Sequence, residues 1–134
     1  MAVNIGPKIG IDGEAEYRKQ LQDIIQQQKT LKAEMQETAS GFDKNTTAME
    51  KAKAKAENLN KQIEIQRTRV EATKKMVEQS TEKYGEADSR TQKWKEALAN
   101  ASTELNNMES ELREVNANLD RAPYDDLTSQ LEAL

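Results

Sequence analysis

The sequence predicts an all-α protein built from long heptad-repeat helices. Apolar residues recur in one seven-residue register from Tyr17 to Ala122, and 24 of the 31 core positions (a and d) are apolar, counting Ala and Tyr. The chain as a whole is only 35% hydrophobic and 33% charged, so the placement of the apolar residues carries this prediction. A narrow apolar seam of this kind is typical of a coiled coil rather than of the wide buried face of a globular-domain helix.

Fifteen large side chains form the predicted helix-packing seam. With Leu21 taken as position a, counting in sevens places each of them at a or d. They are Leu21, Ile24, Leu31, Met35, Leu59, Ile63, Val70, Val77, Trp94, Leu98, Leu105, Met108, Leu112, Val115 and Leu119. Gln28, Asn45 and Gln66 also occupy core positions, where we interpret them as polar residues that set the register.

Two short segments carry signals for the end of one helix and the start of the next. Glycine suits the residue that follows a helix, and Ser/Thr-x-x-Glu/Gln fits a capping box at a helix start. The signals are Gly41 followed by Thr47-x-x-Glu50, and Gly85 followed by Ser89-x-x-Gln92. They predict segmentation near 41–46 and 85–89. The heptad phase is unbroken across both segments, so one continuous helix also fits the pattern.

Three regions follow from these signals. Residues 1–13 form a short N-terminal β-strand or extended arm, because Val3, Ile5, Ile9 and Ile11 alternate with small or polar residues. Residues 14–122 form the heptad-repeat region, with helices at roughly 14–40, 47–83 and 89–121. We expect Pro123 to end the last helix. Residues 123–134, with a new apolar stripe, would begin a further segment that is cut short.

The charges indicate how the helices associate. A parallel, in-register pair would bring like charges together at the e and g positions, for example Arg69 and Lys74. Folding the second helix back on the third instead sets several small residues against large ones. The pairs would be Ala52 with Leu119, Ala56 with Val115, Leu59 with Leu112, Ile63 with Met108, Val70 with Ala101 and Val77 with Trp94. Extended and folded-back arrangements both remain compatible with the register.

Composition argues against most chemical functions. The chain has no Cys and no His, and its carboxylates fall at solvent-facing positions without a sheltered pocket, so we predict no enzyme activity and no metal or cofactor. Residues 44–100 carry 13 basic and 9 acidic side chains, interleaved, which is typical of a solvated helix face rather than a nucleic-acid site. No apolar run approaches a membrane span, and we expect no small-molecule ligand.

Three blocks of the sequence resemble the N-terminal region of tail tape measure proteins from long-tailed phages and related prophage tails. They are Ile9-Gly10-Ile11-Asp12-Gly13 with Tyr17-Arg18-Lys19-Gln20-Leu21, then Phe42-Asp43-Lys44-Asn45, then Tyr84-Gly85-Glu86-Ala87-Asp88-Ser89-Arg90-Thr91-Gln92-Lys93-Trp94. Ala87 departs from the family pattern, where Asn is usual. The likeness covers about residues 3–122.

The resemblance implies a structural role in tail assembly and tail-length determination. Several copies would associate as helical rods, contact tail tube and tail assembly proteins, and lie in the lumen of the tail tube in the virion. Assembly would take place in the cytoplasm of the host bacterium. The alternative that the residues leave open is a cellular coiled-coil scaffold or adaptor with no phage role. Tail genes beside the parent gene would distinguish the two.

Overall fold

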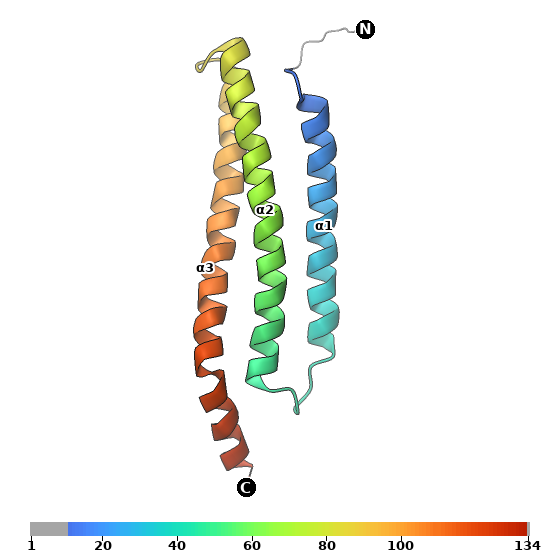
Figure 1. Cartoon of the computed structure of the whole chain (residues 1–134), viewed down its shortest axis with the longest axis vertical. Helices are drawn as coiled ribbons and strands as arrows, with labels where there is room; N and C mark the ends of the chain where they lie inside the picture. Colours follow the sequence, from blue (N-terminus) through green and yellow to red (C-terminus); the bar gives the residue numbers. More distant parts are fainter. Residues whose placement is uncertain (1–10, 134) are drawn as a thin grey trace. The chain divides into compact units, whose positions relative to one another are not determined.

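The structure, a computed structural model, describes residues 11–133. Over these residues it is all-helical and contains no strand, with α1 at Glu14–Ser40, α2 at Ala48–Tyr84 and α3 at Ser89–Glu132 (Figure 1). The all-α prediction and its division into three helices are confirmed. The predicted N-terminal strand or arm lies mostly in residues 1–10, outside the described residues. Residues 11–13 form a turn and not a strand.

The turn before α1 depends on a glycine. The Glu14 N–H donates to the Ile11 carbonyl at 3.2 Å, which closes a four-residue turn whose third residue, Gly13, has a φ of +84°. Residues that carry a Cβ are strained at positive φ, whereas glycine is not. The turn places Ile11 so that its side chain is buried against Tyr17 and Met76.

The chain divides into two compact units. Among the described residues, unit 1 consists of 11–26 and 66–105, and unit 2 consists of 27–65 and 106–133. Each of the three helices therefore contributes one segment to unit 1 and another to unit 2. The contacts described below lie within one unit or the other.

Within each unit, α2 runs antiparallel to α3. In unit 1, Ser80 near the end of α2 contacts Thr91 near the start of α3. In unit 2, Ala48 at the start of α2 contacts Asp126 near the end of α3. Of the two arrangements compatible with the register, the chain adopts the folded-back one.

The prediction that Pro123 ends the third helix is wrong, because α3 continues to Glu132 with Pro123 inside it. A proline in a helix interior removes a hydrogen bond and clashes with the preceding turn, at about 3 kcal/mol. A long-range contact favours the continued helix: the Asp126 carboxylate accepts hydrogen bonds from the N–H groups of Ala48 (2.7 Å) and Met49 (3.4 Å). These donors begin α2 and have no partner within the helix.

The predicted capping box at the start of α2 is confirmed. The Thr47 N–H donates to the Glu50 carboxylate at 2.9 Å, and the Glu50 N–H donates to the Thr47 hydroxyl at 3.1 Å. At the other end of α2, Gly85 has a φ of +93° and its N–H donates to the Thr81 carbonyl at 2.9 Å. This is the glycine cap predicted for that position.

The capping box predicted at Ser89 is wrong, because the cap is Asp88. Its carboxylate accepts the Arg90 N–H at 2.9 Å, and the Arg90 guanidinium donates to both carboxylate oxygens at 2.9 Å. These hydrogen bonds lower the pKa of Asp88 from 3.8 to about 2. A carboxylate also interacts more favourably than a hydroxyl with the positive end of the helix. The Gln92 side chain is bonded instead to the Glu86 carbonyl at 2.7 Å.

Candidate functional site: the helix-packing surfaces

The predicted seam residues are all at least partly shielded from solvent. Five are buried, namely Ile24, Leu31, Leu59, Ile63 and Val115. Ten are half-buried, namely Leu21, Met35, Val70, Val77, Trp94, Leu98, Leu105, Met108, Leu112 and Leu119.

The buried face of α2 in unit 1 is wider than the predicted seam. Met76, at position g of the register, is buried, and Ala72, at position c, packs against the same cluster. The reason is that α2 contacts α1 on one side, through Tyr17, and α3 on the other, through Thr91. A helix with two neighbours buries more than one a/d stripe. The apolar character of Met76 was the available signal, and the narrow-seam interpretation missed it.

An aromatic pair joins α1 to α3 in unit 1. The rings of Tyr17 and Trp94 lie 5.0 Å apart between centroids at an angle of 89°, an edge-to-face contact. Such pairs contribute about 0.5–1.5 kcal/mol beyond the area they bury. Ile11 and Met76 belong to the same cluster. Trp94, which is half-buried, packs against this cluster.

The core of unit 1 contains, besides the buried apolar side chains of Ile24 and Ala101, a polar part. Four polar side chains are 0–1% exposed, and all fall at a or d positions. They are Gln66, Thr73, Ser80 and Thr91. The predicted core position of Gln66 matches its burial, and its amide donates to the Ala101 carbonyl of α3 at 2.8 Å. The same prediction for Asn45 is wrong, because Asn45 is exposed in the turn between α1 and α2.

Two further hydrogen bonds cross between helices in unit 1. The Thr73 hydroxyl donates to the Arg69 carbonyl at 2.8 Å, so the Tyr17 hydroxyl, 2.9 Å away, donates to Thr73. The hydroxyls of Ser80 and Thr91 lie 2.7 Å apart. Buried polar groups are tolerated when they are bonded in this way. The bonds tie α2 to both neighbours at fixed heights along the helix.

The core of unit 2 is aliphatic. One cluster of this core joins three residues of α2 to three of α3. They are Ala52, Ala56, Leu59, Leu112, Val115 and Leu119. These are the residues of three of the pairs predicted for the folded-back arrangement. Every fully buried polar side chain of residues 11–133 belongs to unit 1.

Ion pairs accompany the α2–α3 contacts in both units. Arg69 and Glu104 lie 3.9 Å apart in unit 1, and Lys55 and Glu111 lie 3.5 Å apart in unit 2. All four side chains are more than a quarter exposed, so each pair contributes at most about 1 kcal/mol. Their sign agrees with the charge match expected for folded-back helices.

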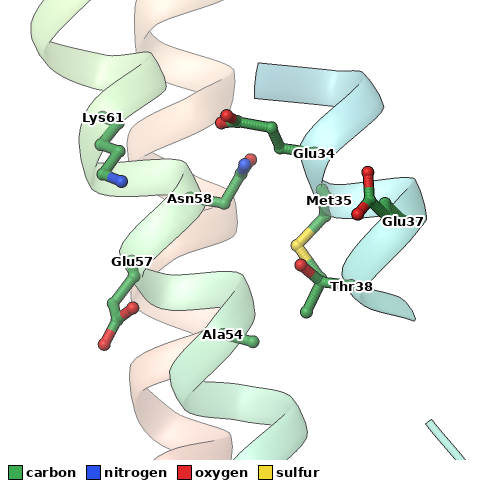
Figure 2. A pocket seen from close by; sticks show the side chains of 8 residues that line it. All are labelled: Glu34, Met35, Glu37, Thr38, Ala54, Glu57, Asn58 and Lys61. Carbon is green, nitrogen blue, oxygen red and sulfur yellow. The ribbon is translucent and has the colours of Figure 1, made fainter. Parts of the chain in front are cut away.

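A polar groove of about 430 Å³ lies between α1 and α2 in unit 2 (Figure 2). Its lining contains three carboxylates and one lysine. The lining residues are Glu34, Met35, Glu37, Thr38, Ala54, Glu57, Asn58 and Lys61. The Asn58 amide points toward α1 and donates to the Leu31 carbonyl at 2.8 Å (Figure 2).

Residues 11–133 contain no group of three Asp, Glu, His or Cys side chains placed to hold a metal ion. None of the described helices is long and apolar enough to cross a membrane. In comparisons with known proteins, no protein-family model, no curated protein and no solved structure matches this chain.

Proposed function

We propose that this chain is the N-terminal helical part of a tail tape measure protein of a long-tailed phage or prophage tail, acting in tail assembly and tail-length determination. The observation that supports this most directly is the structural use of the family-like block Tyr84–Trp94. Gly85 caps α2, Asp88 caps α3, and the Arg90 guanidinium stacks 3.5 Å from the Tyr84 ring centre. The residues that carry the resemblance thus make the turn that lets α2 pack on α3.

In this proposal the chain is a structural protein and not an enzyme. Its a/d seam packs as a coiled coil, and several copies associate with one another. The chain would contact tail tube and tail assembly proteins, lie in the tail tube lumen of the virion, and be assembled in the host bacterial cytoplasm. Its many exposed charges keep the helices from adhering strongly to other surfaces, which suits a part that must later leave the tube.

The folded-back packing changes how much length this region would contribute to the tail. The 37 residues of α2 span roughly 55 Å at about 1.5 Å per residue. Since α2 and α3 lie antiparallel, they cover a shared length and do not add their lengths. Extended helices would add them. The contribution of this region to tail length therefore depends on which state enters the tail.

The test is a deletion of three heptads, residues 57–77, in the parent gene. If the folded-back state is used, tail length stays nearly unchanged and the yield of tails falls, because α3 loses the surface it packs on. If the extended state is used, tails shorten by roughly 32 Å. Electron microscopy of tails measures both quantities. Glu71→Gln, at an exposed position in the same segment, is the matched control and should give normal tails.

Normal tails in normal numbers after the deletion would count against the proposed role. The absence of tube, chaperone and baseplate genes around the parent gene would favour the scaffold or adaptor alternative.

A further inference from the structure

The antiparallel contacts between α2 and α3 do not require that both helices belong to one chain. The Ser80–Thr91 hydrogen bond, the Gln66–Ala101 hydrogen bond and the aliphatic cluster of unit 2 each join one residue set on α2 to another on α3. A second chain running in the opposite direction offers the same two residue sets. The turn at residues 85–88 alone keeps the contacts within one molecule.

The heptad register continues through that turn. Val77, Ser80 and Tyr84 occupy a or d positions before it, Ala87 occupies a d position within it, and Thr91 and Trp94 occupy a and d positions after it. A loop has no need to preserve this phase. If residues 85–88 became helical, α2 and α3 would form one helix whose core positions all remain on one face.

The turn is built so that it can become helical. Gly85 has a φ of +93°, and a Cβ placed there would meet nothing within 4 Å, so a side chain at this position meets no steric obstacle. The next two residues, Glu86 and Ala87, are exposed and are good helix formers. Straightening loses the hydrogen bonds of the Asp88 cap, the Gln92–Glu86 and Lys95–Glu86 contacts and the Arg90–Tyr84 stacking. The helical hydrogen bonds of α2 and α3 themselves remain.

We propose that the α2–α3 surface also serves as an interface with a second copy of this chain. Residues 85–88 become helical, and two chains pair antiparallel, each α2 lying against the α3 of the other. Exchange of identical elements between copies costs little, because the same contacts form in the single chain and in the pair. The opposite charges of Arg69 and Glu104 meet again, whereas a parallel pair would oppose Arg69 to Lys74.

The pair adds one contact that the single chain lacks. At its centre, position a of one copy faces position d of the other, which sets Tyr84 against Ala87 of the second chain. Ala87 is exposed in the single chain. This large-to-small match follows the pattern of the aliphatic pairs in unit 2, where Val115 packs against Ala56.

Gly85→Ala tests the proposal in the full chain. Alanine is strained at positive φ and favours helix over glycine, so the substitution destabilises the turn and stabilises the straight helix. We expect the association constant for the dimer to rise roughly tenfold or more, measured by sedimentation equilibrium against the 15.1 kDa monomer. Gly41→Ala is the matched control and should leave association unchanged, because Gly41 does not have a positive φ.

A disulfide identifies which chains are paired. The protein has no cysteine, so Ser80→Cys with Thr91→Cys introduces a single possible bridge at a site where the native hydroxyls lie 2.7 Å apart. Placed in the Gly85→Ala chain and oxidised as a dimer, it should give covalent dimers on a non-reducing gel. Dimers that contain only bridges within each chain would overturn the proposal, as would a Gly85→Ala chain that stays monomeric at every concentration.

This inference extends the proposed self-association by naming its surface, but it rests on the α2–α3 packing alone. Its experiments use the purified chain and need no tail. A negative result leaves the tape measure proposal standing, and a parent gene without tail neighbours leaves the exchanged dimer standing.

Discussion

The cores of unit 1 and unit 2 use the same heptad register and fill it with different chemistry. Unit 1 buries Gln66, Thr73, Ser80 and Thr91, and hydrogen bonds connect α2 to α1 and to α3. Unit 2 buries Ala, Leu, Ile and Val and has no fully buried polar side chain among its described residues. A single a/d pattern therefore encodes two kinds of helix contact.

The two kinds of core contribute differently to the stability of the helix packing and to its register. Buried aliphatic side chains stabilise in proportion to the area they remove from water, about 25 cal/mol per Å², but they fit several neighbouring registers almost equally. A buried hydrogen bond contributes only about 1 kcal/mol net, yet a slipped register leaves its partners unsatisfied at about 1–3 kcal/mol each. Unit 1 thus specifies the alignment of its helices through fully buried hydrogen bonds. In unit 2 the inter-helix hydrogen bonds, from Asn58 to Leu31 and from Ala48 to Asp126, are only partly buried, and aliphatic burial supplies the stabilisation.

The largest expected effect is in the aliphatic core. Leu59→Ala removes a buried side chain from unit 2 and should lower the free energy of unfolding by about 2–4 kcal/mol, since the site loses apolar burial and leaves a cavity. Chemical denaturation followed by circular dichroism measures the change. Leu127→Ala, an exposed leucine of α3, is the control and should change it by less than about 0.5 kcal/mol. Equal losses for the two variants would contradict the packing of unit 2.

The polar core should show a smaller and non-additive effect. Thr73→Val leaves the Tyr17 hydroxyl buried without its acceptor and should cost about 1–3 kcal/mol, whereas Thr73→Ser keeps the acceptor and should cost less. Combining Thr73→Val with Tyr17→Phe removes both partners and should recover much of the loss. Strictly additive costs in a double-mutant cycle would show that this hydrogen bond does not couple α1 to α2.

The smallest expected effect is a pH dependence of stability that arises at the turn between α2 and α3, in unit 1. The pKa of Asp88 is lowered from 3.8 to about 2 by its bonds to Arg90, so the ionised carboxylate stabilises the folded chain above about pH 4. That contribution is lost as the pH falls toward 2. Melting temperatures between pH 5 and 2 should therefore decline less steeply for Asp88→Asn, which still caps a helix but does not titrate.

The sequence allowed prediction of those features that depend on neighbours along the chain. The heptad period locates the three helices, and Thr47-x-x-Glu50 and Gly85 mark helix ends because their partners lie within four residues. Asp88 displaced the predicted Ser89 cap through an equally local competition. The sequence contained both candidates, and the charge of the carboxylate together with Arg90 decided between them.

The features that were missed depend on contacts distant in sequence. Pro123 lies inside α3 because Asp126 bonds to the start of α2, 78 residues away. Met76 is buried because α2 contacts helices on two sides in unit 1, which a repeat along one helix does not reveal. Asn45 shares the register of the core but lies in a turn, so its phase alone could not place it.

The antiparallel packing of α2 on α3 is the claim on which the rest depends, and one distance measurement tests it directly. Spin labels at Lys51→Cys and Asp125→Cys occupy exposed positions near the start of α2 and the end of α3. Packed helices lie roughly 8–10 Å apart, so electron double resonance should give a label distance below about 30 Å that survives dilution with unlabelled chain. A short distance that disappears on dilution would assign the contact to exchanged dimers. A distance near 110 Å, expected for one straight helix at about 1.5 Å per residue, would contradict the folded-back packing.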